Sequence, residues 1–226
     1  MTELLDCVEI EPAQPARSTI IWLHGLGANG HDFEPIVPEL KLPPDAAVRF
    51  VFPHAPERAV TINNGYVMPA WFDITALDRL EGASETDIET SVQQINALIE
   101  REHKRGVAYE NIVVAGFSQG GVIAQHVAAR FPQQLAGLLA LSTYMPFHEN
   151  LKNNASGRNN AIPVFAAHGQ YDPVIPIRLG RLSHQLAQEL FSNIAWQEYP
   201  MEHSVCWEEI QAIADWLKKL PALGID

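Results

Sequence analysis

The sequence predicts an α/β protein whose mostly parallel β-sheet is covered by helices on both faces. Short apolar runs rich in β-branched residues alternate with segments of helical periodicity along the whole chain. No linker, internal repeat or change in composition divides the 226 residues, so residues 1–226 are expected to form a single domain. A hydrophobic content of 47% is sufficient for a sizeable core.

Each expected strand is a short apolar segment bounded by turn residues. The strands are expected at residues 7–10, 18–23, 48–52, 111–115, 138–142, 162–167 and 194–199. The first of them is expected at an edge of the sheet.

The expected helices lie between these strands. Ser84 and Asp87 predict a capping box, and the apolar residues after them are spaced as on one face of a helix. The other helices are expected at 31–40, where prolines interrupt the pattern, at 122–130, around 179–190, and around 210–220, where Pro221 ends the last one.

Two longer segments have no such pattern. Residues 53–82 carry large apolar side chains, among them Met68, Trp71 and Phe72, and are expected either to cover the core or to line a pocket. Residues 146–160 are polar and are expected to form a surface loop with about one helical turn. Their asparagines and charges cannot form an apolar cover over the sheet.

Composition excludes several classes of partner. There are 15 basic and 27 acidic residues, a net charge of −12, which argues against nucleic acids and anionic membranes. The two cysteines, Cys7 and Cys206, are too few for a disulfide scaffold and lack the spacing of a zinc site. The chain shows no signal-peptide pattern and no bilayer-spanning run, so a cytoplasmic protein without stable membrane insertion is expected.

The most informative motif is Gly116-Phe117-Ser118-Gln119-Gly120, which stands between an expected strand and an expected helix. A serine flanked by glycines in this context is the nucleophile elbow. The turn is so sharp that side chains at the glycine positions would collide with backbone. We therefore expect the hydroxyl of Ser118 to be exposed above the sheet as a nucleophile.

An activated serine needs a base, and in this fold class the chain order is serine, acid, histidine. Of the nine histidines, only His184 and His203 lie after the strand that should carry the acid. His184 is expected on the solvated face of a helix. His203 lies in the loop after the last strand, at the edge of the sheet where the elbow opens, and is the expected base.

The acid should lie between Ser118 and His203. Asp172 follows a strand directly, within a turn shaped by Gly169 and Pro173, and is the expected partner of the histidine. An ordinary Asp-Pro turn is the alternative interpretation of this residue. The carboxylates in less suitable positions are Glu149, Glu189, Glu198 and Glu202.

The glycine-rich loop after the second strand has two interpretations. It can supply an oxyanion hole through the N–H of Leu26, with the N–H of Gln119 as second donor. Gly25, Gly27 and Gly30 also match a dinucleotide fingerprint, which would indicate a nicotinamide-dependent oxidoreductase. Prolines in the following helix and the lack of an acidic residue after the next strand disfavour this alternative.

The chain resembles the carboxylesterase and acyl-protein thioesterase family of α/β-hydrolases. The resemblance covers nearly the whole chain. It is carried by the segments 23–27, 52–56, 71–73, 116–121, 168–169 with 172–174, and His203. Asn29 departs from the pattern, because the bacterial members usually carry Asp there.

The resemblance implies a serine hydrolase that cleaves short-to-medium acyl esters, lysophospholipids or thioesters of acylated proteins, without metal or cofactor. Its catalytic residues would be Ser118, Asp172 and His203. The loop that contains Trp71 would flank the acyl site, and Met68 and Phe72 of the same segment are the other expected substrate-binding residues. Because residues 146–160 are short and polar, we expect an open groove without a large lid. The sequence leaves a monomer and a homodimer open, and a binding protein that has kept the hydrolase fold without turnover is a further alternative.

Overall fold

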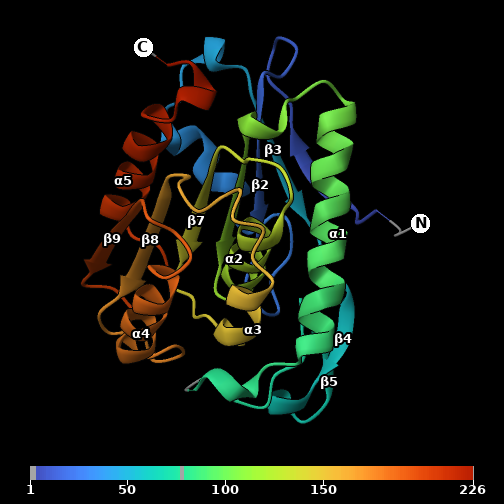
Figure 1. Cartoon of the computed structure of the whole chain (residues 1–226), viewed down its shortest axis with the longest axis vertical. Coiled ribbons are helices and arrows are strands. Elements are labelled where there is room, and N and C mark those ends of the chain that lie inside the picture. Colours follow the sequence, from blue (N-terminus) through green and yellow to red (C-terminus); the bar gives the residue numbers. More distant parts are fainter. Residues whose placement is uncertain (1–3, 77–78, 226) are drawn as a thin grey trace.

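A seven-stranded sheet runs through the middle of the protein, with strand order β1-β3-β2-β6-β7-β8-β9 (Figure 1). The computed structural model describes residues 4–76 and 79–225. The strands are β1 (Cys7–Ile10), β2 (Ser18–Leu23), β3 (Val48–Pro53), β6 (Ile112–Phe117), β7 (Gly137–Leu141), β8 (Val164–Gly169) and β9 (Ile194–Tyr199). Only β1 is antiparallel to its neighbour, and it lies at an edge. The mostly parallel sheet predicted from the sequence is confirmed.

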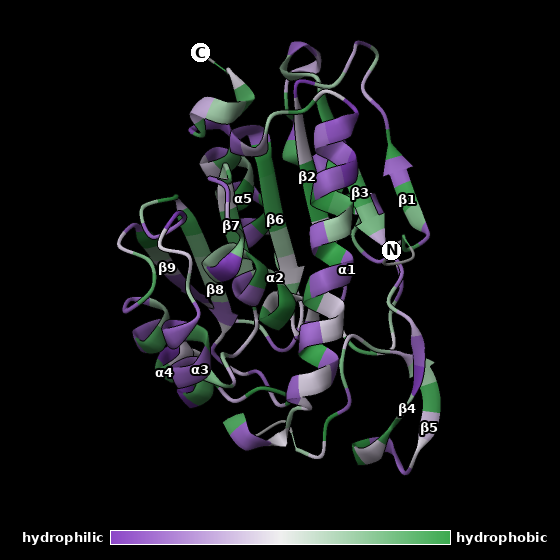
Figure 2. Ribbon diagram, turned by 45° about the vertical axis from the view of Figure 1, so that its right-hand side comes forward, coloured by the Kyte–Doolittle hydropathy of each residue, from purple (hydrophilic) through white to green (hydrophobic). Residues whose placement is uncertain are grey.

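Five α-helices cover the sheet in the described residues: α1 (Glu85–Lys104), α2 (Gln119–Arg130), α3 (His148–Asn153), α4 (Ile177–Ala187) and α5 (Trp207–Lys218). The apolar residues of α1 to α4 share one core cluster, and those of α5 share a second cluster on the other face. Figure 2 shows hydrophobic central strands and an α1 helix that carries both hydrophobic and hydrophilic residues.

Strand β2 shows why both faces must be covered. Ile21 and Leu23 belong to the cluster with α1 to α4, whereas Ile20 and Trp22 belong to the cluster with α5. Successive side chains of a strand point to opposite faces, so a continuously apolar strand is stable only between two helical layers. The same parallel arrangement brings the carboxyl ends of β6, β8 and β9 to one edge of the sheet.

Residues 53–82 are more regular than the sequence indicated. They contain a hairpin of β4 (Glu57–Val60) and β5 (Tyr66–Pro69), which Figure 1 shows beside the first turns of α1. Most residues of the hairpin are exposed or half-buried, including Tyr66 and Val67. The pattern was missed because neither strand has a regularly buried face, so the usual alternation of apolar and polar residues is absent.

The predicted helix at 31–40 is a 3-10 helix at Glu34–Leu40, because Pro38 prevents regular α-helical hydrogen bonding. The predicted capping box is only half formed. Ser84 caps α1 by accepting from the N–H of Asp87, but the Asp87 carboxylate accepts from the N–H of Asp73 and pairs with Arg58. Asp87 therefore fastens the preceding loop to the helix.

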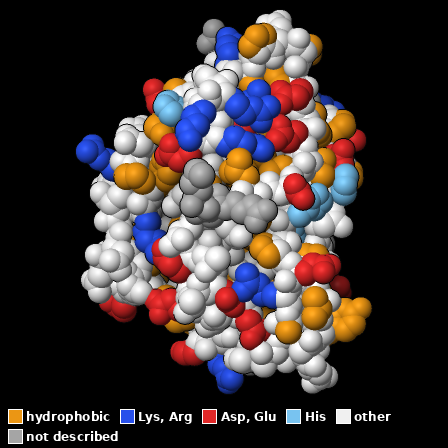
Figure 3. Space-filling model, turned by 90° about the vertical axis from the view of Figure 1, so that its right-hand side faces the viewer, with side chains coloured by type: hydrophobic (Ala, Val, Ile, Leu, Met, Phe, Trp, Pro, Cys, Tyr) orange, Lys and Arg blue, Asp and Glu red, His pale blue; other side chains and the backbone are white. Residues whose placement is uncertain are grey.

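The last turns of α1 are joined to the β1–β3 edge by charged groups. The buried carboxylate of Glu102 contacts Arg49, Arg101 and Arg105. Burial by itself would raise the pKa of Glu102, but these guanidinium groups outweigh it and lower the pKa. Basic and acidic side chains gather on the upper part of the face in Figure 3. Because the carboxylate of Glu102 and the three guanidinium groups around it pair with one another, these charged groups have a structural role.

Glu209 makes protein stability depend on pH. It lies in the first turn of α5 with a fully buried side chain, and burial raises its pKa to about 8, although the backbone of Cys206 partly opposes the shift. The unfolded chain loses this proton near pH 4.5, whereas the folded protein keeps it until about pH 8. The contribution of Glu209 to the unfolding free energy therefore falls as pH rises through this window.

We expect Glu209→Gln to gain stability relative to the wild type as pH rises from 5 to 9. The full change should be on the order of 3 to 5 kcal/mol. Urea unfolding at several pH values measures it, with Glu208→Gln as the exposed control from the same helical turn. Parallel stability curves for the wild type and Glu209→Gln would show that Glu209 does not titrate in this range.

Candidate active site

The backbone forms a sharp turn at Ser118, between β6 and α2. Ser118 has φ 54° and ψ −120°, a conformation that side chains rarely adopt. A Cβ at Gly116 would lie 2.2 Å from the carbonyl oxygen of Gly120, and one at Gly120 would lie 2.4 Å from that of Leu23. The two glycines are therefore required for the close approach of β6, α2 and β2.

Three side chains from separate loops meet at this turn. Nε2 of His203 lies 3.0 Å from Oγ of Ser118, and Nδ1 of His203 lies 2.7 Å from Oδ2 of Asp172. Asp172 follows β8 and His203 follows β9, so the carboxyl ends of parallel strands bring all three residues together. This arrangement allows His203 to take a proton from Ser118 while Asp172 holds the imidazole.

The acid is held in one orientation by its own loop. Oδ1 of Asp172 accepts from the backbone N–H groups of Val174 and Ile175, each at 2.8 Å. Burial by itself would raise the pKa of Asp172, but the hydrogen bonds from His203, Ile175 and Val174 lower it below the usual value. The carboxylate is therefore ionised at neutral pH, and Oδ2 faces the histidine.

Sequence reasoning assigned no role to His168 beyond the resemblance. Its imidazole is completely buried at the end of β8. Nε2 lies 2.8 Å from the carbonyl oxygen of Ile175 and 3.4 Å from Oδ2 of Asp172. A carbonyl can only accept, so Nε2 carries the hydrogen, and burial lowers the pKa of the ring. The neutral histidine connects the loop that contains Asp172 to β8. In the sequence, the signal for this role was the position of His168 four residues before Asp172.

Two backbone N–H groups near the serine are free. Among residues 4–76 and 79–225, the N–H groups of Leu26 and Gln119 donate to no other protein atom. The loop of Leu26 reaches Ser118, because a Cβ at Gly25 would lie 3.3 Å from Cβ of Ser118. Gln119 directly follows Ser118. Free donors on both sides of a nucleophile are what an oxyanion hole requires.

The structure changes the interpretation of the expected acyl-site residues. Trp71 and Phe72 are 0% exposed, so neither has surface with which to line a groove, and the structure favours the alternative that this segment covers the core. Their side chains belong to the core under the glycine-rich loop. Met68 is half-buried beside that loop, 3.6 Å from a Cβ built on Gly27, and remains a candidate for substrate contact.

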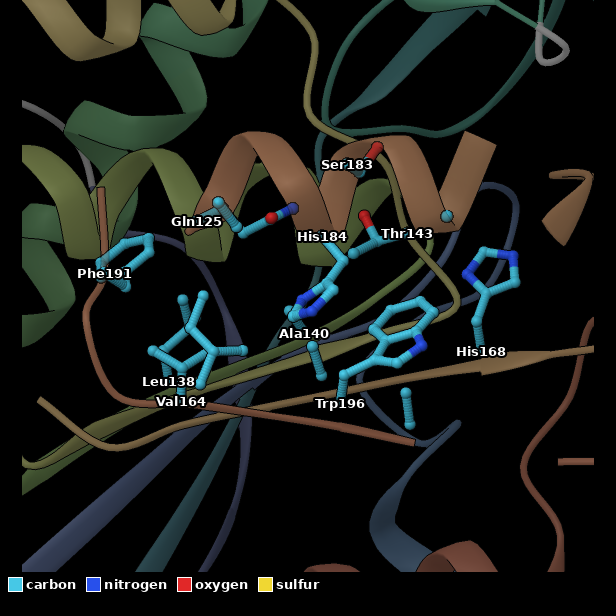
Figure 4. A pocket seen from close by; sticks show the side chains of 15 residues that line it. Gln125, Leu138, Ala140, Thr143, Val164, His168, Ser183, His184, Phe191 and Trp196 are labelled. Carbon is cyan, nitrogen blue, oxygen red and sulfur yellow. The ribbon is translucent and has the colours of Figure 1, made fainter. Parts of the chain in front are cut away.

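His184 is not the solvated residue that its helical position indicated. It is half-buried, and its ring stacks on that of Trp196, with ring centroids 4.9 Å apart. Edge strand β9 extends far enough for Trp196 to cover this face of α4. Both rings line a small cavity of about 20 Å³, and Figure 4 shows His168 on the far side of Trp196 from His184. That volume holds about one water molecule and is too small for an acyl chain.

No helix in the described part of the chain is both long and apolar enough to cross a lipid bilayer.

Comparison with known proteins identifies the family. The phospholipase/carboxylesterase family model matches residues 5–221. Acyl-protein thioesterase 1 of Saccharomyces cerevisiae is 37% identical over 213 residues, 91% of this chain and 94% of that protein. Acyl-protein thioesterase 1 of Cryptococcus neoformans is 35% identical over 237 residues, 96% of this chain and 98% of that protein.

Two plant structures have the same architecture. Arabidopsis thaliana SOBER1 is 29% identical, with a TM-score of 0.84 over 90% of this chain and 99% of that one. Zea mays acyl-protein thioesterase 2 is 28% identical, with a TM-score of 0.83 over 97% and 99% of the two chains. The chain therefore belongs to the phospholipase/carboxylesterase family of α/β-hydrolases and is a serine hydrolase of carboxylic esters.

Proposed function

We propose that the protein hydrolyses short-to-medium acyl esters and thioesters through an acyl-enzyme on Ser118, with His203 as base and Asp172 as the acid that orients it. The observation that carries this proposal is the continuous chain of contacts from Ser118 Oγ to His203 and from His203 to Asp172. Among the described residues, the N–H groups of Leu26 and Gln119 have no other acceptor and are therefore available to bind the oxyanion.

In the first half-reaction, Ser118 Oγ attacks the acyl carbonyl carbon, and His203 accepts the hydroxyl proton at Nε2. His203 then returns this proton to the leaving alcohol or thiol. Water attacks the acyl-enzyme in the second half-reaction, again with His203 as base, and releases the acid and free Ser118. Asp172 stays ionised throughout and stabilises the imidazolium form of His203.

The residues around the glycine-rich loop indicate where the acyl group binds. The hairpin approaches this loop, because the N–H of Gly27 donates to the carbonyl of Pro69 at 2.8 Å. No large lid covers the sheet in the described residues; the segment after β7 holds only the short helix α3. We propose an open groove with Met68 at its wall and with residues 1–226 acting as one domain.

We infer the class of the leaving group from the names of the relatives. Three of them are named acyl-protein thioesterases and match this chain over nearly its full length. Their names support a thioester of an acylated protein as a substrate, beside small esters. Lysophospholipid is the second candidate and is supported by the description of the family model.

A substrate panel tests the proposal. We expect turnover of p-nitrophenyl esters and acyl thioesters, with kcat/KM rising from acetyl to medium chains, since each buried CH₂ contributes up to about 0.8 kcal/mol. Met68→Ala should flatten this rise, whereas Val67→Ala should not, because neighbouring residues of a strand face opposite sides. Lysophosphatidylcholine completes the panel. Turnover of long-chain triglyceride with activation at an oil–water interface would contradict the open groove.

A further inference from the structure

The two donors of the proposed oxyanion hole come from distant parts of the sequence. Leu26 lies in the loop after β2, and Gln119 begins α2. Two donors can bind one oxygen atom only if their separation is held to within about half an ångström. Neither the loop nor the helix sets this distance by itself. A third segment, which contains Trp71, contacts both of them.

The indole of Trp71 holds the loop of Leu26. Its side chain is 0% exposed, and Nε1 donates to the carbonyl oxygen of His24 at 2.8 Å. The Trp71 ring also packs against the imidazole of His24, with ring centroids 5.3 Å apart. The carbonyl oxygen of Trp71 accepts from the hydroxyl of Ser91 on α1, at 2.5 Å. Through these two hydrogen bonds, Trp71 attaches the start of the loop that contains Leu26 to helix α1.

His24 passes this constraint on to the N–H of Leu26. Nε2 of His24 accepts from the N–H of Ala55 at 3.1 Å, so Nδ1 carries the hydrogen and donates to the carbonyl oxygen of Gly25 at 2.7 Å. Burial lowers the pKa of His24 to about 4, so the ring is neutral at physiological pH. Because the peptide bond between Gly25 and Leu26 is planar and trans, holding its oxygen directs its N–H to the opposite side.

The second donor is attached to the same segment. Oε1 of Gln119 accepts from the backbone N–H of Trp71 at 3.0 Å, and Nε2 donates to the carbonyl oxygen of Phe72 at 2.8 Å. The Gln119 side chain is almost completely buried, so water does not compete for these hydrogen bonds. Gln119 is thereby joined to the backbone of Trp71, and the indole of the same Trp71 holds the loop that carries the other donor, Leu26.

We propose that Trp71 is a positioning residue of the oxyanion hole, coupling the N–H groups of Leu26 and Gln119 through its indole N–H and its backbone N–H. This inference rests on the proposed function. When Ser118 Oγ bonds to the carbonyl carbon, its proton passes to His203 and the π electrons of the carbonyl move to the oxygen. Trp71 touches neither substrate nor this oxygen, and acts only by fixing the two donors.

Trp71→Phe tests the proposal, because it removes the indole N–H and keeps an aromatic ring. Trp22→Phe is the matched control: Trp22 is also buried, it packs in the core cluster on the opposite face, and its Nε1 has no hydrogen-bond partner among the described residues. Both variants lose the same atoms. Only Trp71→Phe removes the donor to His24.

The readouts are kcat, KM and the affinity for two inhibitors. A trifluoromethyl ketone forms a tetrahedral oxyanion with the serine, and the corresponding secondary alcohol does not. Trp71→Phe should lower kcat and weaken ketone binding roughly tenfold to a hundredfold, less than the loss of a whole donor. KM and alcohol binding should stay within about twofold, and Trp22→Phe should change no parameter more than about twofold.

Two results would overturn the role of Trp71. One is an equal effect of Trp71→Phe and Trp22→Phe, which would indicate general packing. The other is an equal loss of ketone and alcohol binding, which would indicate a wall for substrate. Thermal unfolding verifies that each variant is folded. If Trp71→Phe does not fold, Gln119→Met replaces it, because this change keeps the N–H of residue 119 and removes its bonds to Trp71 and Phe72.

Failure of the proposed function gives a different result. Treatment of the wild type with a fluorophosphonate should yield one adduct on Ser118. An absent adduct, or one on another residue, contradicts the proposed function itself. An adduct on Ser118 together with wild-type kcat and ketone affinity in Trp71→Phe contradicts only the role of Trp71.

Discussion

Ser118→Ala should lower kcat by about four to six orders of magnitude for every ester and thioester that the wild type hydrolyses. The reason is chemical: without Oγ, the imidazole of His203 has no nucleophile to activate and no acyl-enzyme forms. Rates of p-nitrophenyl ester hydrolysis measure the loss. A fluorophosphonate or phenylmethylsulfonyl fluoride should add once to the wild type by intact mass and not to the variant.

Ser142→Ala is the matched control for this experiment. Ser142 also lies at the carboxyl end of a central strand, is 0% exposed and has a positive φ of 44°. Its hydroxyl has no hydrogen-bond partner among the described residues and so none in His203, and both labelling and turnover should therefore persist. An adduct that maps to another serine, or turnover that survives in Ser118→Ala, would show that the nucleophile lies elsewhere.

Asp172→Asn should lower kcat by about 10⁴ while the protein stays folded. The carboxylate accepts from Nδ1 of His203, which leaves Nε2 free to accept the proton of Ser118. An amide can present its N–H₂ to Nδ1 instead, and the imidazole then carries its hydrogen on Nε2, where it cannot act as a base. Steady-state kinetics measure the loss, and circular dichroism verifies the fold.

Asp73→Asn separates this effect from the loss of any hydrogen-bonded carboxylate. Asp73 accepts from the backbone N–H of Thr61 at 2.7 Å and from its hydroxyl at 2.6 Å, so it holds the connection between β4 and β5. We expect this variant to change stability or substrate binding more than the chemical step. Equal turnover in the wild type and Asp172→Asn would place the acid elsewhere.

The expected site residues differ in how much their prediction depended on local sequence. Ser118 stands in a motif whose glycines and flanking segments are contiguous, and the conformation of the turn follows from steric repulsion over five residues. His203 and Asp172 were predicted from their places after strands. Since parallel strands end at one edge of a sheet, position along the chain was sufficient to bring them near Ser118. Their catalytic roles stay predictions that the variants above test.

Other side chains were misjudged because contacts distant in sequence decide their surroundings. The periodicity of α4 placed His184 in solvent, but Trp196 on the edge strand covers it. The segment of Trp71 was expected either in the core or at a pocket, and the sequence could not decide between them, because the indole donates to the carbonyl oxygen of His24, a residue distant in sequence. Asp87 was expected to complete a capping box, and Asp73 and Arg58 compete for its carboxylate.

By itself, the sequence determined the layered α/β architecture, the sharp turn at Ser118 and the positions of Asp172 and His203 at the carboxyl ends of later strands. These depend on hydrophobic periodicity and on the conformational freedom of glycine, which act over a few residues. Only the tertiary structure decided which large side chains are buried and which hydrogen bonds they make. A buried donor or acceptor must find a partner wherever the fold brings one close, and for Trp71, His168 and Gln119 that partner belongs to another loop or to a nearby turn.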